Sequence, residues 1–103
     1  MAKIKDIALV CKSKNAGPFE VTIDVVFAER ETFDRVKACG VLTRERVAAL
    51  YNVAPEDVLF TVYEPALAFK ATLPRLIPAG DSGDTDVYGC QQHAPLLELD
   101  LPI

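Results

Sequence analysis

The sequence predicts an α+β fold, a two-layer sandwich in which a mostly antiparallel sheet carries helices on one face. Alternating apolar and polar residues, typical of strands, occur in FEVTIDVVF at 19–27 and in ALAFKATL at 66–73. Between them, 29–40 and 43–52 have the apolar spacing of amphipathic helices. The 103 residues, 50% of them hydrophobic, fit one domain spanning 1–103 with its own core.

The first elements are a strand, a turn and a second strand. IALVCKS at 7–13 predicts a strand buried on both faces, and KNAGPF at 14–19 provides turn residues. The strand at 19–27 is apolar on one face and polar on the other. Its apolar face comprises Phe19, Val21, Ile23, Val25 and Phe27.

Two helices follow these strands. The first, 29–40, ends at Gly40, which can adopt the left-handed conformation of a C-terminal cap. The second, 43–52, begins with Thr43 as N-cap and ends at Asn52. The residues expected to face the sheet are Phe33, Val36, Val47, Leu50 and Tyr51.

The second half of the chain contains the remaining predicted elements. They are strands at 58–63 and 66–73, a loop at 74–83, a short helix from Asp84 to near Pro95, and a last element at 96–101. We expect this last element to close the sheet or to dock against it.

Charge, hydropathy and cysteine content exclude several classes of protein. The net charge is −4 and no run of basic residues occurs, so the electrostatic footprint of a nucleic-acid-binding protein is missing. The apolar runs are too short for a membrane span or a signal peptide. Cys11, Cys39 and Cys90 fit neither a disulfide framework nor a zinc site. We therefore expect a cytoplasmic protein that binds neither nucleic acid nor membrane.

The segment GDSGDTDVYGCQQHAPLL at 80–97 is strongly polar and contains the single histidine of the chain. Cys90 and His93 are three residues apart and would share one face of a helix, so a catalytic thiol–imidazole pair is one interpretation. The alternative is a partly buried cysteine and a hydrogen-bonded histidine.

The same segment also offers oxygen ligands for a divalent cation. Asp81, Asp84 and Asp86, with His93, are the candidate ligands. Their spacing matches no calcium loop, and ordinary turn and N-cap chemistry also explains them. We therefore assign no metal and no cofactor.

A second polar segment, CKSKNAGPFE at 11–20, combines lysines with a glycine turn. Lysines and backbone N–H groups suit a carboxylate or a phosphate, although such turns are also common on protein surfaces. If this segment meets the 80–93 loop in space, the two form one site, with Lys70 and Arg75 as further cationic contacts. The polar residues concerned are Lys12, Ser13, Lys14 and Asn15.

Four motifs, SKNAGPFE, GVLT, PALAFKATLPR and GDTDVYGCQQHAPLL, together span nearly the whole chain. In these motifs the chain resembles a small family known only as a domain of unknown function. Its members are linked, as neighbours or in one chain, to proteins like the acyclic terpene utilisation protein AtuA. The resemblance therefore implies an AtuA-like large subunit as partner.

A second likeness is to the C-terminal domain of AtuA-like proteins, which is described as ferredoxin-like. The similar residues here are Asp6-Ile7-Ala8, Ser13 to Gly17, Leu42-Thr43, Glu45-Arg46-Val47 and Pro65-Ala66-Leu67. The AtuA-type loop looks like SGDKG, whereas this chain has SKNAG and places GDSGDTD later. The likeness thus implies a ferredoxin-like sandwich and does not transfer binding residues.

The resemblance to the small family implies a small subunit or accessory domain of a two-component catabolic enzyme. The reaction would be that of a lyase or hydratase acting on an acyl-CoA or a hydroxy-carboxylic acid. In this interpretation His93 and Tyr88 are catalytic, because a histidine suits acid/base work near neutral pH. The expected substrate-binding residues are Lys12, Ser13, Lys14, Asn15, Asp84, Asp86 and Gln91.

Two other functions stay open. One is a non-catalytic module that oligomerises or regulates through an exposed sheet face or strand edge. The other is an independent small enzyme that uses Cys90 and His93. Whichever of the three functions holds, we expect a homo-oligomer, since symmetric dimers are common among small domains with sheet edges to cover.

Overall fold

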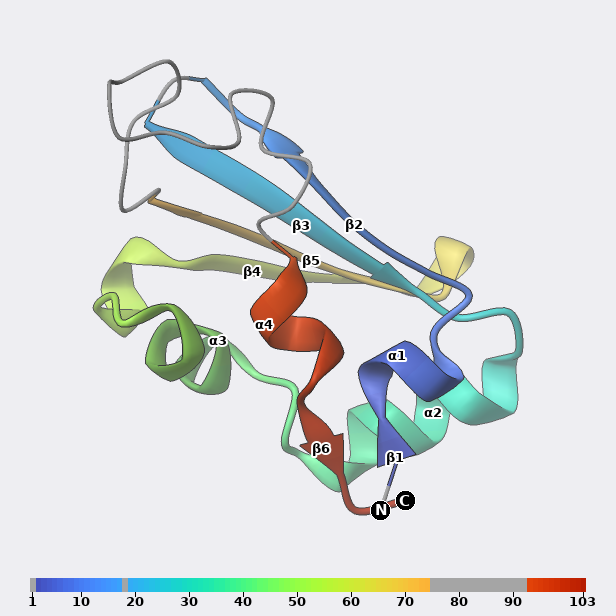
Figure 1. Cartoon of the computed structure of the whole chain (residues 1–103). Coiled ribbons are helices and arrows are strands. Elements are labelled where there is room, and N and C mark those ends of the chain that lie inside the picture. Colours follow the sequence, from blue (N-terminus) through green and yellow to red (C-terminus); the bar gives the residue numbers. More distant parts are fainter. Residues whose placement is uncertain (1, 18, 75–92) are drawn as a thin grey trace.

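The computed structural model describes residues 2–17, 19–74 and 93–103. Its main feature is a four-stranded antiparallel sheet in the order β2-β3-β5-β4, with the α helices of the described residues on one side of it (Figure 1). The strands are β2 (Val10–Asn15), β3 (Glu20–Val26), β4 (Leu59–Tyr63) and β5 (Ala68–Pro74). The predicted two-layer α+β sandwich is confirmed.

The two longest helices, α2 (Arg30–Cys39) and α3 (Arg44–Tyr51), have the predicted boundaries because their caps are encoded locally. Gly40 ends α2 with a φ of 73°, in the left-handed region that glycine tolerates. Thr43 Oγ1 accepts a hydrogen bond from the backbone N–H of Arg46 at 3.2 Å, which caps α3. Asn52 then ends α3 with a φ of 55°.

The order of elements along the main sheet is two strands, two helices and two strands, with every neighbouring pair of strands antiparallel. A ferredoxin-like chain instead repeats a split βαβ unit, in the order βαββαβ. The fold class is therefore as predicted, while the path of the chain through the described sheet differs from that of a ferredoxin-like domain.

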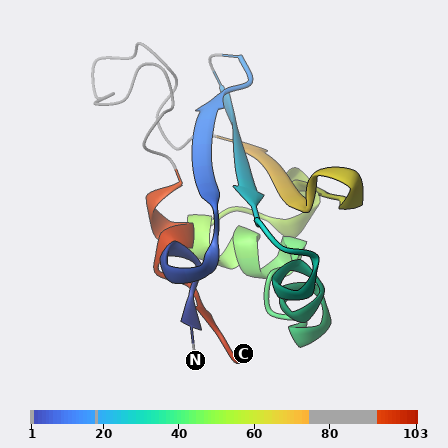
Figure 2. The same cartoon turned by 90° about the vertical axis from the view of Figure 1, so that its right-hand side faces the viewer.

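The two ends of the chain form a small sheet of their own. β1 (Ala2–Lys3) pairs with β6 (Asp100–Leu101) in antiparallel fashion, so the termini lie side by side in both views (Figures 1 and 2). The expected element at 96–101 thus pairs with the N-terminus and not with the main sheet.

The predicted start of the first long strand was wrong. The first long strand begins only at Val10, because Ile4–Ile7 forms the single helical turn α1 with the Ile4 side chain fully buried. The helix expected from Asp84 to near Pro95 lies mostly outside the described residues, and α4 (Ala94–Leu97) contains Pro95 in its first turn. Proline is tolerated there because the first N–H groups of a helix have no partner within the helix.

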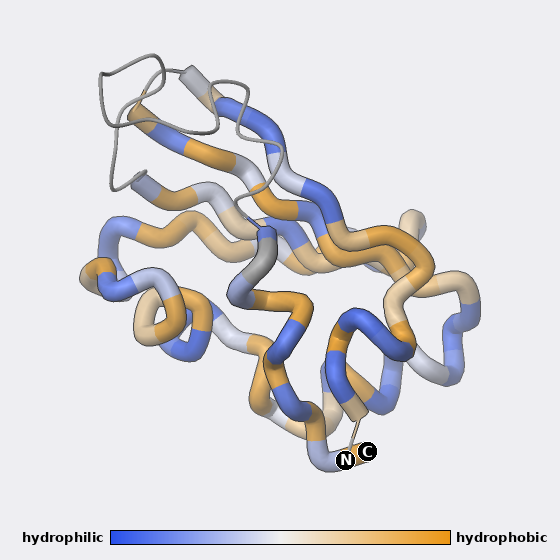
Figure 3. The backbone as a smooth tube through the Cα atoms, in the orientation of Figure 1, coloured by the Kyte–Doolittle hydropathy of each residue, from blue (hydrophilic) through white to orange (hydrophobic). Residues whose placement is uncertain are grey.

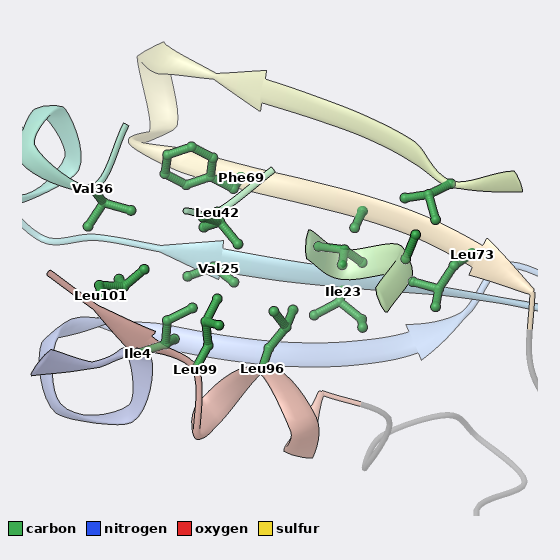
Figure 4. Close-up of a cluster of buried hydrophobic side chains, with 14 of the residues drawn as sticks. Ile4, Ile23, Val25, Val36, Leu42, Phe69, Leu73, Leu96, Leu99 and Leu101 are labelled. Atoms are coloured by element: carbon green, nitrogen blue, oxygen red, sulfur yellow. The ribbon is translucent and has the colours of Figure 1, made fainter. Parts of the chain in front are cut away.

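The core lies between the main sheet and the helices. Ile23 and Val25 of β3 point toward Leu96 and Leu99 from the C-terminal segment (Figure 4). Phe69 of β5 packs against other aromatic rings, with its centroid 5.0 Å from that of Phe33. Phe19 was expected in this layer, but it precedes β3 and is 66% exposed.

The opposite face of the main sheet is not covered by any of the described α helices (Figure 2). β2 is hydrophilic from Lys12 to Asn15, beside the largely apolar β3 (Figure 3). Two short 3₁₀ helices, η1 (Pro55–Asp57) and η2 (Glu64–Ala66), flank β4. Among the described helices, none has the length and apolar character needed to span a membrane.

Candidate functional site

The polar segment at 11–20, predicted as the end of a strand followed by a turn, belongs to the strand β2 as far as Asn15, and this decides where its side chains point. Side chains alternate between the two faces of a strand. Ser13 and Asn15 pair in register with Ile23 and Val21, which are buried under the helices. Lys12 and Lys14 therefore lie on the open face, opposite to Ser13 and Asn15, so the four residues do not line one site.

Ser13 and His93, which are 80 residues apart in the sequence, are in contact. Ser13 Oγ lies 3.2 Å from His93 Nδ1, and the backbone N–H of His93 donates a hydrogen bond to the same Oγ at 3.2 Å. Ser13 is only 7% exposed. The structure thus brings one predicted substrate-binding residue to the predicted catalytic histidine, and we call this contact the Ser13–His93 pair.

The Ser13–His93 pair fixes the position of the imidazole, and the direction of the hydrogen bond decides which ring nitrogen carries the hydrogen. If the Ser13 hydroxyl donates to Nδ1, the neutral ring carries its hydrogen on Nε2; if the hydroxyl accepts, Nε2 is the basic atom. No partner of Nε2 occurs among the described residues. The Nε2 atom of a ring held in this way is the one that could donate or accept a proton.

The same contact also has a structural consequence. His93 is the N-cap residue of α4, and its carbonyl accepts hydrogen bonds from the N–H groups of Leu96 and Leu97. Ser13 therefore ties the start of α4 to β2. This anchoring positions the imidazole whether or not the ring takes part in chemistry.

Cys11 and Tyr51 lie on the same side of the sheet as the Ser13–His93 pair. Burial, with a contribution from the charge of Asp24, raises the pKa of the Cys11 thiol to about 11. Burial also raises the pKa of the Tyr51 hydroxyl above its ordinary value, and the neighbouring Cys11 adds to this, while a backbone hydrogen bond with Leu96 opposes it. Both groups are neutral at physiological pH, so Cys11 is not an activated nucleophile.

The open face of the sheet contains a groove of about 330 Å³, which we call the open-face groove. It is lined by Lys12, Asp24, Val26, Thr61, Tyr63, Ala66, Ala68 and Lys70. Lys70 Nζ lies 4.0 Å from Asp24 Oδ1. Sequence reasoning named Lys12 and Lys70 but missed Asp24 and Tyr63, although the polar positions of alternating strands were a signal for a shared polar face.

The other predicted site residues, Tyr88, Asp84, Asp86 and Gln91, lie outside the described residues, as do Asp81, Cys90 and Arg75. Their roles stay predictions. In the part of the chain that the structure describes, no three His, Cys, Asp or Glu side chains are grouped so that they could hold a metal ion.

Comparison with known proteins places the chain in a family. No curated protein and no solved structure matches it. A family model described as a domain of unknown function (DUF4387) matches residues 4–100, a span that contains both the Ser13–His93 pair and the open-face groove. The chain therefore belongs to the DUF4387 family.

Proposed function

We propose that this chain is the small subunit or accessory domain of a two-component catabolic enzyme whose large subunit is an AtuA-like protein. We propose a lyase or hydratase reaction on an acyl-CoA or a hydroxy-carboxylic acid. The partner and the reaction class are supported by the resemblance of the sequence motifs to the small family linked to AtuA-like proteins. Within the chain, the contact between Ser13 and His93 is the observation that carries the proposal.

His93 would act as the acid/base group of this reaction. Removal of water from a hydroxy acid takes one proton from carbon and gives one proton to the departing hydroxyl group. An imidazole whose ring is held by Ser13 is suited to either transfer through Nε2. Ser13 would be a positioning residue, since it contacts the ring and is itself almost completely buried.

The surroundings of the Ser13–His93 pair support the need for a partner. Two of the cavities lined by described residues, the open-face groove and one at the connection that leads into α3, contain neither Ser13 nor His93. Among the described strands β2 lies at the edge of the main sheet, and an edge strand is a common place for another chain to dock. A large subunit docked at this edge would supply the walls of a substrate pocket beside His93.

Coexpression with an AtuA-like protein encoded in the same gene cluster tests this proposal. We expect a stoichiometric complex by size exclusion with light scattering. The complex would then be incubated with hydroxy-carboxylic acids and acyl-CoA thioesters, with gain or loss of water followed by mass spectrometry. Two separate chromatographic peaks would contradict the two-component proposal.

Substitution of His93 tests its chemical role separately. His93→Gln keeps a side chain that can hydrogen-bond with Ser13 but cannot transfer a proton, so the complex should form while turnover falls by about a hundredfold or more. Lys5→Met, on the exposed surface of α1, is the matched control and should leave turnover unchanged. Full turnover in His93→Gln would rule out acid/base catalysis by this residue.

A second candidate function is a non-catalytic oligomerisation module. It is favoured by large apolar side chains at the open face, where Leu59 is 67% exposed and Tyr63 is 58% exposed. Exposed apolar side chains of this kind are typical of interaction surfaces when they lie together. A stable homodimer of the chain alone, with no effect of His93→Gln on the partner's turnover, would support this function.

A further inference from the structure

We propose that the open-face groove binds a small organic carboxylate with a short apolar body. This inference is independent of the proposed function. The groove lies on the opposite face of the sheet from the Ser13–His93 pair, and its ligand can be tested on the chain by itself.

Strand register places charged side chains in one row across the groove. Lys12 pairs with Asp24, Asp24 with Lys70, and Lys70 with Thr61, in the order of the four strands. Cross-strand neighbours have Cβ atoms about 4.5–5.5 Å apart, so the two ammonium groups can reach the same anion from either side of Asp24.

The charge of this face is opposite to that of the whole chain. The row of Lys12, Asp24 and Lys70 is followed by a row that contains Lys14, so the two rows hold three lysines and one aspartate in a chain of net charge −4. Asp24 offsets Lys70, whereas Lys12 makes no ion pair within the described residues. One unbalanced positive charge inside the groove suits a monoanion better than a phosphate dianion.

The row on the other side of the charges is apolar. Val26 pairs with Ala68, and Ala68 pairs with Tyr63, so these residues form a hydrophobic strip parallel to the lysines. The groove volume of about 330 Å³ is at the lower end of the range for small-molecule sites, roughly 300–1,000 Å³. The ligand therefore has a carboxylate at Lys12 and Lys70 and an apolar part on Val26, Ala68 and Tyr63.

Charge also argues against a second copy of this chain seated in the groove, so an oligomer formed through the open face would have to keep the lysine rows of the two copies apart. Face-to-face packing would bring the same three lysines of each copy together, and like charges across an interface are unfavourable. A small carboxylate meets the positive charge without this repulsion.

An NMR titration of the isotopically labelled chain with hexanoate tests the proposal, with hexanamide as a neutral ligand of nearly the same shape. We expect hexanoate to shift the amide signals of Asp24–Val26 and Ala68–Lys70, with at least about threefold tighter binding than hexanamide. The affinity should fall as salt is added, because the lysines are partly exposed. Equal affinities for hexanoate and hexanamide would overturn the proposal.

Variants that remove a single charge should change the affinity for hexanoate in opposite directions, according to the sign of that charge. Lys12→Met and Lys70→Met should each weaken hexanoate binding by about threefold, whereas Asp24→Asn should strengthen it because a repulsive charge is removed. Lys5→Met, on α1, is the matched control and should have no effect. If Lys5→Met weakens binding as much as Lys12→Met does, the effect is one of net charge and the groove is not the site.

A different occupant would also be visible in this experiment. If hexanoate up to its solubility limit leaves the groove signals unchanged while an acidic peptide shifts them, the groove is a protein-docking surface and the small-molecule assignment is wrong. Circular dichroism of each variant confirms that the fold is retained, so a loss of binding reports on the groove itself.

Discussion

On the helix-covered face of the main sheet, β3 presents Ile23 and Val25 to the core; on the open face, the same strand presents Thr22 and Asp24. The backbone is shared, and only the alternation of side chains separates the two faces. The covered face contributes packing energy, whereas the open face contributes charge and a groove. Substitutions one or two residues apart on the same strand should therefore have effects of different kinds.

The largest contrast in stability is expected between two aromatic residues on opposite faces. Phe69→Ala removes a buried ring that packs against Phe27, Phe33 and Phe60, and it should lower the free energy of unfolding by about 3–5 kcal/mol. Tyr63→Ala, on the open face, should lower it by less than about 1 kcal/mol. Urea unfolding of both variants checks this, and equal losses would show that the open face is part of the core.

Cysteine alkylation compares the covered face and the open face of the sheet at neighbouring positions on β2. The pKa of Cys11 is raised from 9.0 to about 11, so its thiolate fraction at pH 8 is about a hundredfold smaller than that of an ordinary thiol. Alkylation by iodoacetamide, followed by peptide mass spectrometry, should be slower by at least this factor and should accelerate as the pH rises toward 11. Lys12→Cys in a Cys11→Ala background moves the thiol to the open face, where we expect an ordinary rate.

The Ser13–His93 pair should contribute less than the aromatic core. Ser13→Ala leaves the backbone N–H of His93 without its acceptor, which should cost about 1–3 kcal/mol of unfolding free energy. A double-mutant cycle with His93→Ala isolates the contact between Oγ and Nδ1, for which we expect a coupling of about 0.5–1.5 kcal/mol. A coupling free energy of zero, obtained from urea unfolding of the four proteins of the cycle, would show that the two side chains do not interact in solution.

The smallest expected change concerns the start of α3 in the helical layer. Thr43→Ala removes the side-chain acceptor for the N–H of Arg46 and should cost about 1 kcal/mol. Thr43→Ser keeps the hydroxyl group, so its effect on the unfolding free energy should be only a few tenths of the effect of Thr43→Ala. If thermal unfolding shows the same loss for both variants, the methyl group of Thr43 matters and its hydroxyl does not.

Much of the fold could be predicted from the sequence because its signals are local. The alternation around Ile23 and the caps at Gly40, Thr43 and Asn52 each depend on a few neighbouring residues, and the structure has them where they were expected. The terminal sheet could not be predicted, since β1 and β6 have two residues each and depend on pairing across nearly the whole chain. A two-residue strand has no periodicity to detect.

The candidate site was only partly predictable for the same reason. Ser13 and His93 were both named, but their contact depends on where α4 docks, which no local pattern encodes. Lys12 and Lys14 were grouped with Ser13 in one site; because all three lie on β2, where side chains alternate, the two lysines lie on the opposite face from Ser13. The row of Lys12, Asp24 and Lys70 requires the register of three strands, and that register is set by the packing of the covered face.

The measurement that tests the proposed function most directly is amide hydrogen exchange of this chain, alone and mixed with the AtuA-like protein. The proposal predicts slower exchange in the mixture along the edge strand β2 and at the start of α4, where Ser13 holds His93. Exchange that is unchanged throughout, or slowed only along β4 and β5, would contradict a partner docked beside His93.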